Sequence, residues 1–463
     1  MTAGRTKRAS ALSETATSSD WRWPRLGVLA SSRFRRLSRE FLWIGVGQAA
    51  TVLGAVVGIR ILTAVLPPDS YGRLALGMTV ATLATQTVLG PLGNAAMRFF
   101  APAREAGALR SYFAAVKRLL LEASGAMGVL AFVLILILDL TGHWEWVGLV
   151  LAATLFALVS GYNSVLNGMQ NAARQRAIVA LHHGLATWGR FLLAAGMVLW
   201  LGAGTTIAML GYAAAMIIVL GSQGWFFRRT LSCGQACVPS EAPQERWRIE
   251  ILTYAWPFAI WGFPAWVQMV SDRWALQGFC STEDVGRYAA LYQLGYYPIT
   301  ICTNLMVQLV APVFFQRAGD ASDLSRVERV YRLNRKLTVA ALALTAVATL
   351  MAWAWHDPIV RFLVAAEYRT ISGLLPGMVL AGGLFASGQL AVVSLLSGVQ
   401  TRALVLPKVA TAVLGVVLNI LGAALFGTPG VVAAMVLAAA VYLIWILCLA
   451  ALRPRHVQAG ASP

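Results

Sequence analysis

The feature that most limits how this chain can fold is a series of long stretches without any charged residue. They alternate with short basic clusters, and each approaches or exceeds the ~20 residues with which a helix crosses a bilayer. Charged residues make up 12% of the 463 residues, whereas a soluble globular domain usually carries about twice that share. The pattern predicts an all-α polytopic membrane protein. The stretches are 74–97, 123–138, 147–173, 288–316 and 409–452.

Hydropathy predicts about twelve transmembrane helices in two sets of six, at 41–65, 71–97, 119–139, 144–169, 176–200, 204–227, 250–274, 286–314, 335–355, 371–397, 404–426 and 429–452. A Gly-Thr-Pro-Gly sequence at 427–430 is expected to form the turn between the last two. The predicted organisation is a basic tail (1–40), a first six-helix bundle (41–228), a linker (229–249), a second six-helix bundle (250–452) and a short tail (453–463).

The distribution of arginine and lysine supports this number of spans. Of the 37 basic residues, 30 fall in the two tails and in alternate connecting segments, as expected if those segments are cytoplasmic. Both termini are therefore predicted to be cytoplasmic. The first 40 residues lack the short apolar core and cleavage site of a signal peptide. The other seven basic residues are Arg60, Arg73, Arg190, Arg273, Arg287, Arg361 and Arg369.

The net charge of +18 could indicate nucleic-acid binding. However, the basic residues punctuate apolar spans and do not form one face, so membrane topology explains them better and no nucleic-acid partner is expected. The five cysteines have the spacing of neither a disulfide framework nor a metal site. No cofactor and no metal are predicted.

Two segments in corresponding places of the two halves resemble each other. Residues 66–76 follow the first span and residues 281–291 follow the seventh, and each carries an acidic residue and then Gly-Arg before the next helix. The glycines are Gly72 and Gly286. Because six spans is an even number, the two halves are predicted to be parallel repeats, with a pseudo-twofold axis along the membrane normal.

Charged residues within the spans are the strongest candidates for a binding site, because a buried charge is costly and usually faces a cavity or a partner. Arg60 and Arg273 precede the repeated glycines at almost equal distance, and Asp272 adjoins Arg273. Arg190 lies deep in the fifth span, seven residues after His183 and hence on the same helical face. The alternatives are that Arg60 and Arg273 extend to the interface, that Arg190 is structural, and that Asp272 only pairs with Arg273.

Helix packing can also be read from small residues and prolines. Ala50, Gly54 and Gly58 have four-residue spacing and should let another helix approach the first span closely. Prolines are expected to bend several helices, either where they line a cavity or for packing alone. They are Pro91, Pro257, Pro264 and Pro298.

The sign of the deep charges favours an anionic ligand. The deep positions offer arginine and histidine, whereas the carboxylates lie closer to helix ends. Guanidinium groups match phosphate through paired donors, which indicates a phosphate or diphosphate. Polar residues within the spans could contact sugar hydroxyls, namely Gln48, Asn94, Asn163 and Gln268.

The segment from Arg60 to Leu76 resembles the start of polysaccharide flippases in the multidrug/oligosaccharidyl-lipid/polysaccharide exporter superfamily. The segment 271–290 and the Ala-Glu-Tyr-Arg sequence at 366–369 are similar to that family too. The resemblance implies a V-shaped pair of six-helix bundles in the bacterial inner membrane. It also implies a basic central cavity, for which Arg60, Arg190 and Arg273 are the counterparts.

The expected function is therefore the flipping of undecaprenyl-diphosphate-linked oligosaccharides for surface polysaccharide synthesis, by alternating access. The expected partners are this lipid-linked substrate, the phospholipid bilayer and polysaccharide assembly proteins. One alternative is a cation-coupled multidrug antiporter of the same superfamily, against which the basic deep charge counts. Another is a membrane glycosyltransferase or polysaccharide polymerase, which would need acid/base groups on a sizeable outward loop. No such loop is predicted, so we expect a transporter and not an enzyme.

Overall fold

The computed structural model describes residues 32–232, 244–319, 323–398 and 402–459. Most of the predicted basic tail and part of the predicted linker lie outside these residues. Two compact units make up the chain, residues 1–43 and 44–463. The described part of the first unit is the beginning of helix α2 (Ser32–Val65). The second unit holds the rest of α2 and all the other helices.

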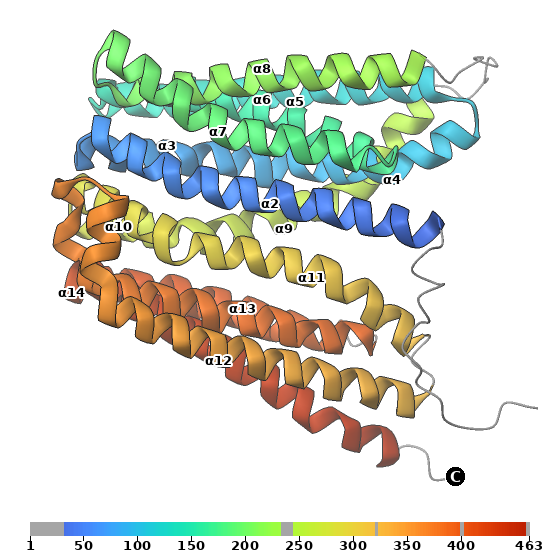
Figure 1. Ribbon diagram of the computed structural model, residues 1–463. Helices are drawn as coiled ribbons and strands as arrows, with labels where there is room; N and C mark the ends of the chain where they lie inside the picture. Colours follow the sequence, from blue (N-terminus) through green and yellow to red (C-terminus); the bar gives the residue numbers. More distant parts are fainter. Residues whose placement is uncertain (1–31, 233–243, 320–322, 399–401, 460–463) are drawn as a thin grey trace, which may run out of the picture. The chain divides into compact units, whose positions relative to one another are not determined.

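The helices that follow α2 in the first half of the chain lie alongside one another (Figure 1). Between α3 and α4 stands a π-helical turn, η1, in which the Gly90 N–H donates to the Thr85 carbonyl. This turn directly precedes Pro91, which has no N–H of its own to donate. The elements are α3 (Pro68–Ala84), η1 (Thr85–Leu89), α4 (Gly90–Glu105), α5 (Leu109–Leu140), η2 (Trp144–Trp146), α6 (Val147–Ala172), α7 (Arg176–Leu201) and α8 (Thr205–Ser232).

The second half of the chain forms longer helices. They are α9 (Gln244–Phe279), α10 (Thr282–Gly295), α11 (Tyr297–Ala318), α12 (Leu324–Leu363), η3 (Ala366–Leu374), α13 (Leu375–Ser397) and α14 (Arg402–Ala459). Pro298 is the second residue of α11, two residues after the break at Tyr296, while α9 contains both Pro257 and Pro264. Among the described helices, the most enclosed span is the one that η3 and α13 form, in which 72% of the residues of its most apolar stretch are buried.

The described helices account for the predicted spans. Ten segments are long and apolar enough to cross a membrane. One of them, Ala403–Leu452, is 50 residues long and breaks at Gly427, whose φ of 63° is left-handed and suits glycine. This segment therefore supplies the last two predicted spans. Helix α9 is not among the ten, but it occupies the place of the seventh. The prediction of an all-α polytopic membrane protein is confirmed.

The two ends of the helices differ in charge. We call one the basic end, where helices connect at residues 105–109 and 172–176 and where residues 232, 244, 318 and 324 also lie. We call the other the opposite end, where helices connect at residues 65–68, 140–147, 201–205, 279–282 and 363–366.

The repeated turns pack directly on each other at the opposite end. Gly72 of α3 lies against the backbone of Thr282 and Gly286 of α10. Gly286 in turn lies against the backbone of Pro68 and Gly72. A Cβ atom at either glycine would overlap a carbonyl oxygen of the facing helix. This reciprocal contact is what a pseudo-twofold axis between the two segments predicts.

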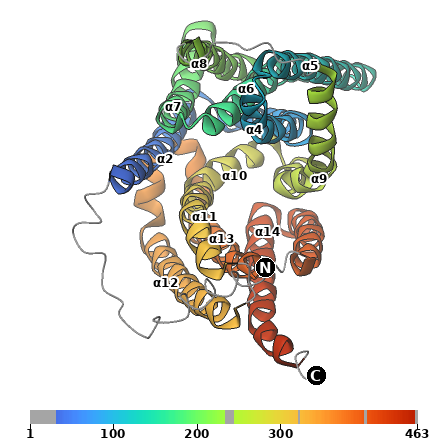
Figure 2. The ribbon, with the colours of Figure 1, turned by 90° about the vertical axis from the view of Figure 1, so that its right-hand side faces the viewer.

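Helix α9 begins the second half of the chain and packs on the first half as well as on α14. At the basic end, Trp247 is 3% exposed and meets the Tyr112 ring of α5 edge-on, with the centroids 6.1 Å apart. Further along, Gly262 lies against the backbone of η1, and the Trp266 Nε1 donates to the Thr79 carbonyl of α3 at 2.8 Å. Figure 2 shows α9 beside α4 and α5.

Four charged side chains reinforce this attachment. Arg248 of α9 pairs with Glu122 of α5 at 3.2 Å and with Glu245 at 2.8 Å. Arg118 of α5 pairs with Glu122 at 3.1 Å and with Glu245 at 3.6 Å. The hydrogen bonds that Arg248 donates to Glu122 and then to Glu245 raise the pKa of its guanidinium above the ordinary value. Single exposed pairs contribute little to stability, so these four side chains add as a network to the packing of Trp247 and Gly262.

Candidate substrate-binding site

Arg60 is an exposed cation on α2. Its guanidinium has no hydrogen-bond or carboxylate partner among the described residues. The helix is anchored on its other side, because Gly54 and Gly58 face Trp188 and Phe191 of α7, and the Trp188 Nε1 donates to the Ala50 carbonyl at 3.0 Å. The prediction that these small residues admit another helix is therefore confirmed. Arg60 is left free to meet an anion.

Arg273 and Asp272 are enclosed, with side chains 15% and 5% exposed. The Arg273 Nη1 lies 3.6 Å from the Asp272 Oδ1, and its guanidinium stacks 4.6 Å from the centre of the Tyr292 ring. Asp272 also accepts a hydrogen bond from the Tyr288 hydroxyl at 2.7 Å. We expected no deep carboxylate, and Asp272 corrects this. It lies seven residues before the end of α9, at a depth of about 10 Å for 1.5 Å per residue.

The two arginines are not at equivalent positions of the repeat. Arg60 precedes Gly72 by 12 residues, whereas Arg273 precedes Gly286 by 13. One residue turns a helix by about 100°. The difference explains why Arg60 faces an open surface and Arg273 packs against α10. The structure shows no contact between Arg60 and Arg273 within the described chain.

Arg190 is half-buried on α7. Its Nε donates to the Ala186 carbonyl at 3.2 Å, and the guanidinium lies 6.0 Å from the centre of the Tyr212 ring of α8. No carboxylate pairs with it among the described residues. His183 is exposed on the same helix, whereas its neighbour His182 is buried, with its ring nitrogens 2.8 Å from the Ile178 carbonyl and 3.2 Å from the Ser222 hydroxyl.

The polar residues divide into two groups. Asn94 and Gln268 are exposed and Gln48 is half-buried, so a ligand can reach all three. Asn163 instead belongs to a buried amide cluster, because its Nδ2 donates to the Gln223 Oε1 of α8 at 2.5 Å. Gln223 is fully buried. We therefore withdraw Asn163 as a sugar contact.

Some exposed polar residues within the helices were missed. Arg98 stands four residues after Asn94 on α4, and both are exposed, but its place near a predicted span end made it look like part of a basic loop. Asn304 and Gln308 form a similar exposed pair on α11. The four-residue spacing, which places two side chains on one face, was the signal that could have identified both pairs.

A polar cavity of about 540 Å³ lies at the opposite end, between α12 and η3. Arg361 and Arg369 line it with Asp357 and Ser372, and the Ser372 hydroxyl donates to the Asp357 Oδ1 at 2.7 Å. Arg361 is therefore an exposed residue that also lines this polar cavity. Among the described residues, no group of three or more His, Cys, Asp or Glu side chains could hold a metal ion.

Comparison with known proteins places the chain in a wider group. Residues 37–317, well over half of the chain, match the family described as "Polysaccharide biosynthesis protein". No curated protein matches the sequence.

Solved structures of transporters share the fold at low sequence identity. The lipid II flippase MurJ in an inward closed conformation has a TM-score of 0.65 and 11% identity, covering 88% of this chain and 86% of MurJ. An inward-facing multidrug resistance MATE family transporter of the MOP superfamily has a TM-score of 0.63 and 14% identity, covering 90% and 96%. A MOP superfamily transporter from Pyrococcus furiosus has a TM-score of 0.55 and 15% identity, covering 90% and 95%.

Proposed function

Because the chain belongs to the polysaccharide biosynthesis protein family and is a multi-pass membrane transporter, not an enzyme, we propose that it flips a lipid-linked oligosaccharide. The proposed substrate is an undecaprenyl-diphosphate-linked glycan for surface polysaccharide. The proposed location is the bacterial inner membrane, with the basic end and both termini in the cytoplasm, since cytoplasmic segments hold most arginine and lysine.

The observation that carries the substrate assignment is the state of Arg60. It is an exposed guanidinium on a membrane helix without a carboxylate partner among the described residues. A bare cation in hydrocarbon is costly, so it must face water or an anion. A diphosphate supplies that anion, and a guanidinium can bind it through two donors at once. Arg190 contacts a carbonyl and an aromatic ring and pairs with no carboxylate among the described residues, so an anion would compensate its charge too.

Arg273 has a different role in this proposal. Its charge is already compensated by Asp272 at 3.6 Å and by the Tyr292 ring. It therefore offers a diphosphate less attraction than Arg60 or Arg190 does. We propose that Arg60 holds the diphosphate, that Arg190 is a second cationic position on the substrate's path, that Gln48 and Asn94 contact the glycan, and that the Asp272–Arg273 pair meets the substrate only when the helices rearrange.

Buried Asp272 favours a second candidate, the cation-coupled multidrug antiporter. A cationic drug requires a deep carboxylate, and Asp272 is 3% exposed. However, the Asp272 carboxylate already pairs with Arg273 and accepts a hydrogen bond from the Tyr288 hydroxyl, which counts against this candidate. A cationic substrate would have to displace the guanidinium, at the cost of leaving a buried charge unpaired.

Purified protein in liposomes tests the proposal. A fluorescent undecaprenyl-diphosphate oligosaccharide should cross the bilayer with wild-type protein, whereas a cationic dye should not. The Arg60→Gln variant should lose most of the glycan transport, and Arg332→Gln should keep it, because that side chain is 62% exposed at the basic end. Transport of the dye without transport of the glycan would establish the antiporter instead.

A further inference from the structure

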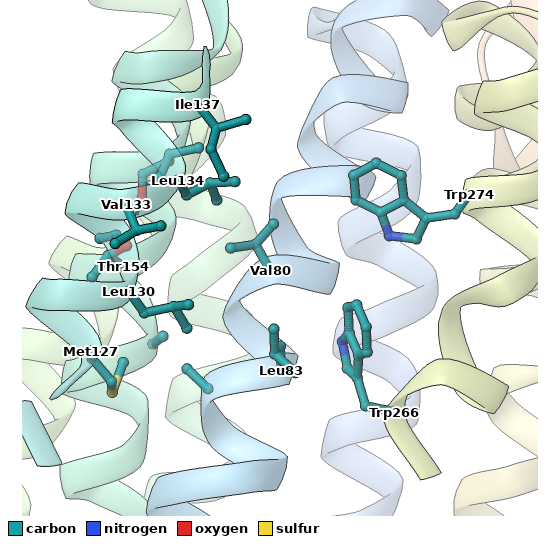
Figure 3. A pocket seen from close by; sticks show the side chains of 14 residues that line it. Val80, Leu83, Met127, Leu130, Val133, Leu134, Ile137, Thr154, Trp266 and Trp274 are labelled. Atoms are coloured by element: carbon teal, nitrogen blue, oxygen red, sulfur yellow. Dashed lines mark hydrogen bonds between the residues drawn. The ribbon is translucent and has the colours of Figure 1, made fainter. Parts of the chain in front are cut away.

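An apolar cavity of about 270 Å³ opens between α3, α5, α6 and α9. Figure 3 shows Leu130 and Leu134 of α5 on one side, Val80 of α3 between, and the rings of Trp266 and Trp274 of α9 on the other side. These residues place the cavity in the half of the membrane toward the opposite end, since α5 ends there at Leu140.

The polar atoms of the lining side chains are all directed elsewhere. The Trp266 Nε1 donates to the Thr79 carbonyl at 2.8 Å, and the Trp274 Nε1 donates to the Thr79 hydroxyl at 3.0 Å. The Thr154 hydroxyl donates to the Val150 carbonyl within α6 at 2.8 Å. Both indoles are thereby fixed, with only hydrocarbon facing the cavity. Water has no partner there, so the cavity suits an apolar ligand.

The cavity is open toward the lipid. Val133 and Ile137 line it and are about half exposed, at 45% and 51%. Helices α5 and α9 are joined at the basic end by Trp247 against Tyr112 and by the Arg248–Glu122 pair. Farther toward the opposite end, the cavity lies between α5 and α9. A hydrocarbon chain can therefore enter sideways from the bilayer and regain the dispersion contacts that a void would forfeit.

The charge beside the cavity indicates which hydrocarbon it holds. Arg273 directly precedes Trp274 on α9 and so lies at the same depth, 15% exposed. In this structure its guanidinium packs on Asp272 and on the Tyr292 ring. When the helices rearrange as proposed above, a lipid whose tail fills the cavity would bring its head group to this depth, where a diphosphate is the anion that a guanidinium matches best. A neutral or zwitterionic bulk phospholipid has less to gain at this position.

We propose that this cavity between α3, α5, α6 and α9, called the groove from here on, binds the polyprenyl tail of the transported lipid while its diphosphate is at the opposite end. The inference rests on the proposed function and adds a tail site to it. The groove gives the tail a place in the half of the bilayer where transport ends, so the tail and head group arrive together.

Photo-cross-linking tests occupancy independently of transport. A benzophenone amino acid at Leu134, which lines the groove, should label tritiated undecaprenyl phosphate in liposomes. Unlabelled undecaprenyl phosphate should compete for this labelling, and added phospholipid should not. The same group at Val129, which is 65% exposed one turn away and does not line the groove, should give little specific label. Equal labelling at the two positions, or competition by phospholipid, would overturn the proposal.

Filling the groove tests its role in transport. Val133→Trp should reduce transport of the long-chain substrate by about tenfold, the effect of losing ~1.4 kcal/mol of apolar contact. It should spare an analogue with a short prenyl tail. Val129→Trp introduces the same ring on the same helix outside the groove and should leave both rates unchanged. Equal losses for both tail lengths in Val133→Trp would contradict a tail site.

The two proposals fail in different ways. If wild-type protein moves neither substrate, the flippase proposal is wrong, whereas specific labelling at Leu134 would still establish a polyprenyl groove. If wild-type protein flips the glycan but Val133→Trp is as active as Val129→Trp, the flippase proposal holds and the groove proposal is wrong.

Discussion

At the scale of single residues, Arg60, Arg190 and Asp272 are charges that lie within membrane helices, where an unpaired charge is costly. Whether each is open or compensated depends on neighbouring helices that are remote in sequence. Tyr288 and Tyr292 belong to the next helix and decide the state of the Asp272–Arg273 pair. Arg60 precedes its glycine by 12 residues and Arg273 precedes its own by 13, and this difference of one residue places the two side chains in different surroundings.

Arg190→Ala should abolish glycan transport while the protein stays inserted and abundant, because the arginine is only half-buried. Arg190→Lys should recover part of the transport, since it restores the charge without the forked donors. Complementation of a flippase-deficient strain measures the function, and immunoblotting of membranes measures abundance. Full complementation by the alanine variant would remove Arg190 from the binding site.

The Asp272–Arg273 pair should behave as a unit in stability. Arg273→Ala leaves a buried carboxylate without its cation and should destabilise the protein by about 3 kcal/mol, seen as a lower melting temperature in detergent. The double variant Asp272→Ala with Arg273→Ala should recover much of that loss, because neither charge is then stranded. A double variant as unstable as the single one would show that the two charges are not coupled.

At the scale of elements, the spans were predictable because hydropathy and length determine them directly. The contacts between helices were predictable only where glycine marked them, as at Gly54 and Gly58 against α7. The π-helical turn before Pro91 and the attachment of α9 to α5 were not predictable. Both depend on side-chain packing between segments far apart in the chain, which hydrophobic periodicity does not encode.

The Gly72–Gly286 contact should act as a closure at the opposite end. Gly286→Ala places a methyl group against the Pro68 carbonyl and should hold the two turns apart. A disulfide between Pro68→Cys and Thr282→Cys should therefore form more slowly in Gly286→Ala than in the otherwise unchanged protein. Gly125→Ala is the control, because nothing lies within 4 Å of the added atom. Unchanged cross-linking in Gly286→Ala would show that the contact is not close in the membrane.

At the scale of the whole molecule, the topology rests on the placement of 30 of the 37 basic residues. The number of helices agrees with it, but the side of the membrane at which each end lies stays a prediction. The boundaries between the tails, the two six-helix bundles and the linker are predictions as well. Rocking of the two halves would open the glycine contact in one state and close it in the other, and transport then requires that the substrate bind the two states with different affinity.

Labelling of single cysteines should place residue 235 in the cytoplasm and residue 282 outside. The physical reason is that the segment around 235 lies between basic residues, which resist translocation. A membrane-impermeant maleimide applied to intact cells and to lysed cells measures both positions. Protection of both residues, or labelling of both in intact cells, would overturn the assignment.

A cross-link between the ends of α2 and α9 at the opposite end should arrest export, because rocking requires those ends to separate. Cysteines in place of Ala64 and Gly278, which are both exposed and stand at the same offset from the paired glycines, would be joined by a bifunctional reagent. Reduction should restore transport when a cleavable reagent is used. Export at full rate with the link in place would contradict the rocking mechanism.

Helix α9 links the two halves of the chain. Trp247, Arg248 and Gly262 pack it on the first half, and its later residues pack on α14, where the Asn419 Nδ2 donates to the Ser271 hydroxyl. A gene split between codons 232 and 244 would thus encode a second fragment whose first helix, α9, binds the first fragment. Two such polypeptides, made separately in one cell, should find each other and restore the working protein without the peptide bond between them.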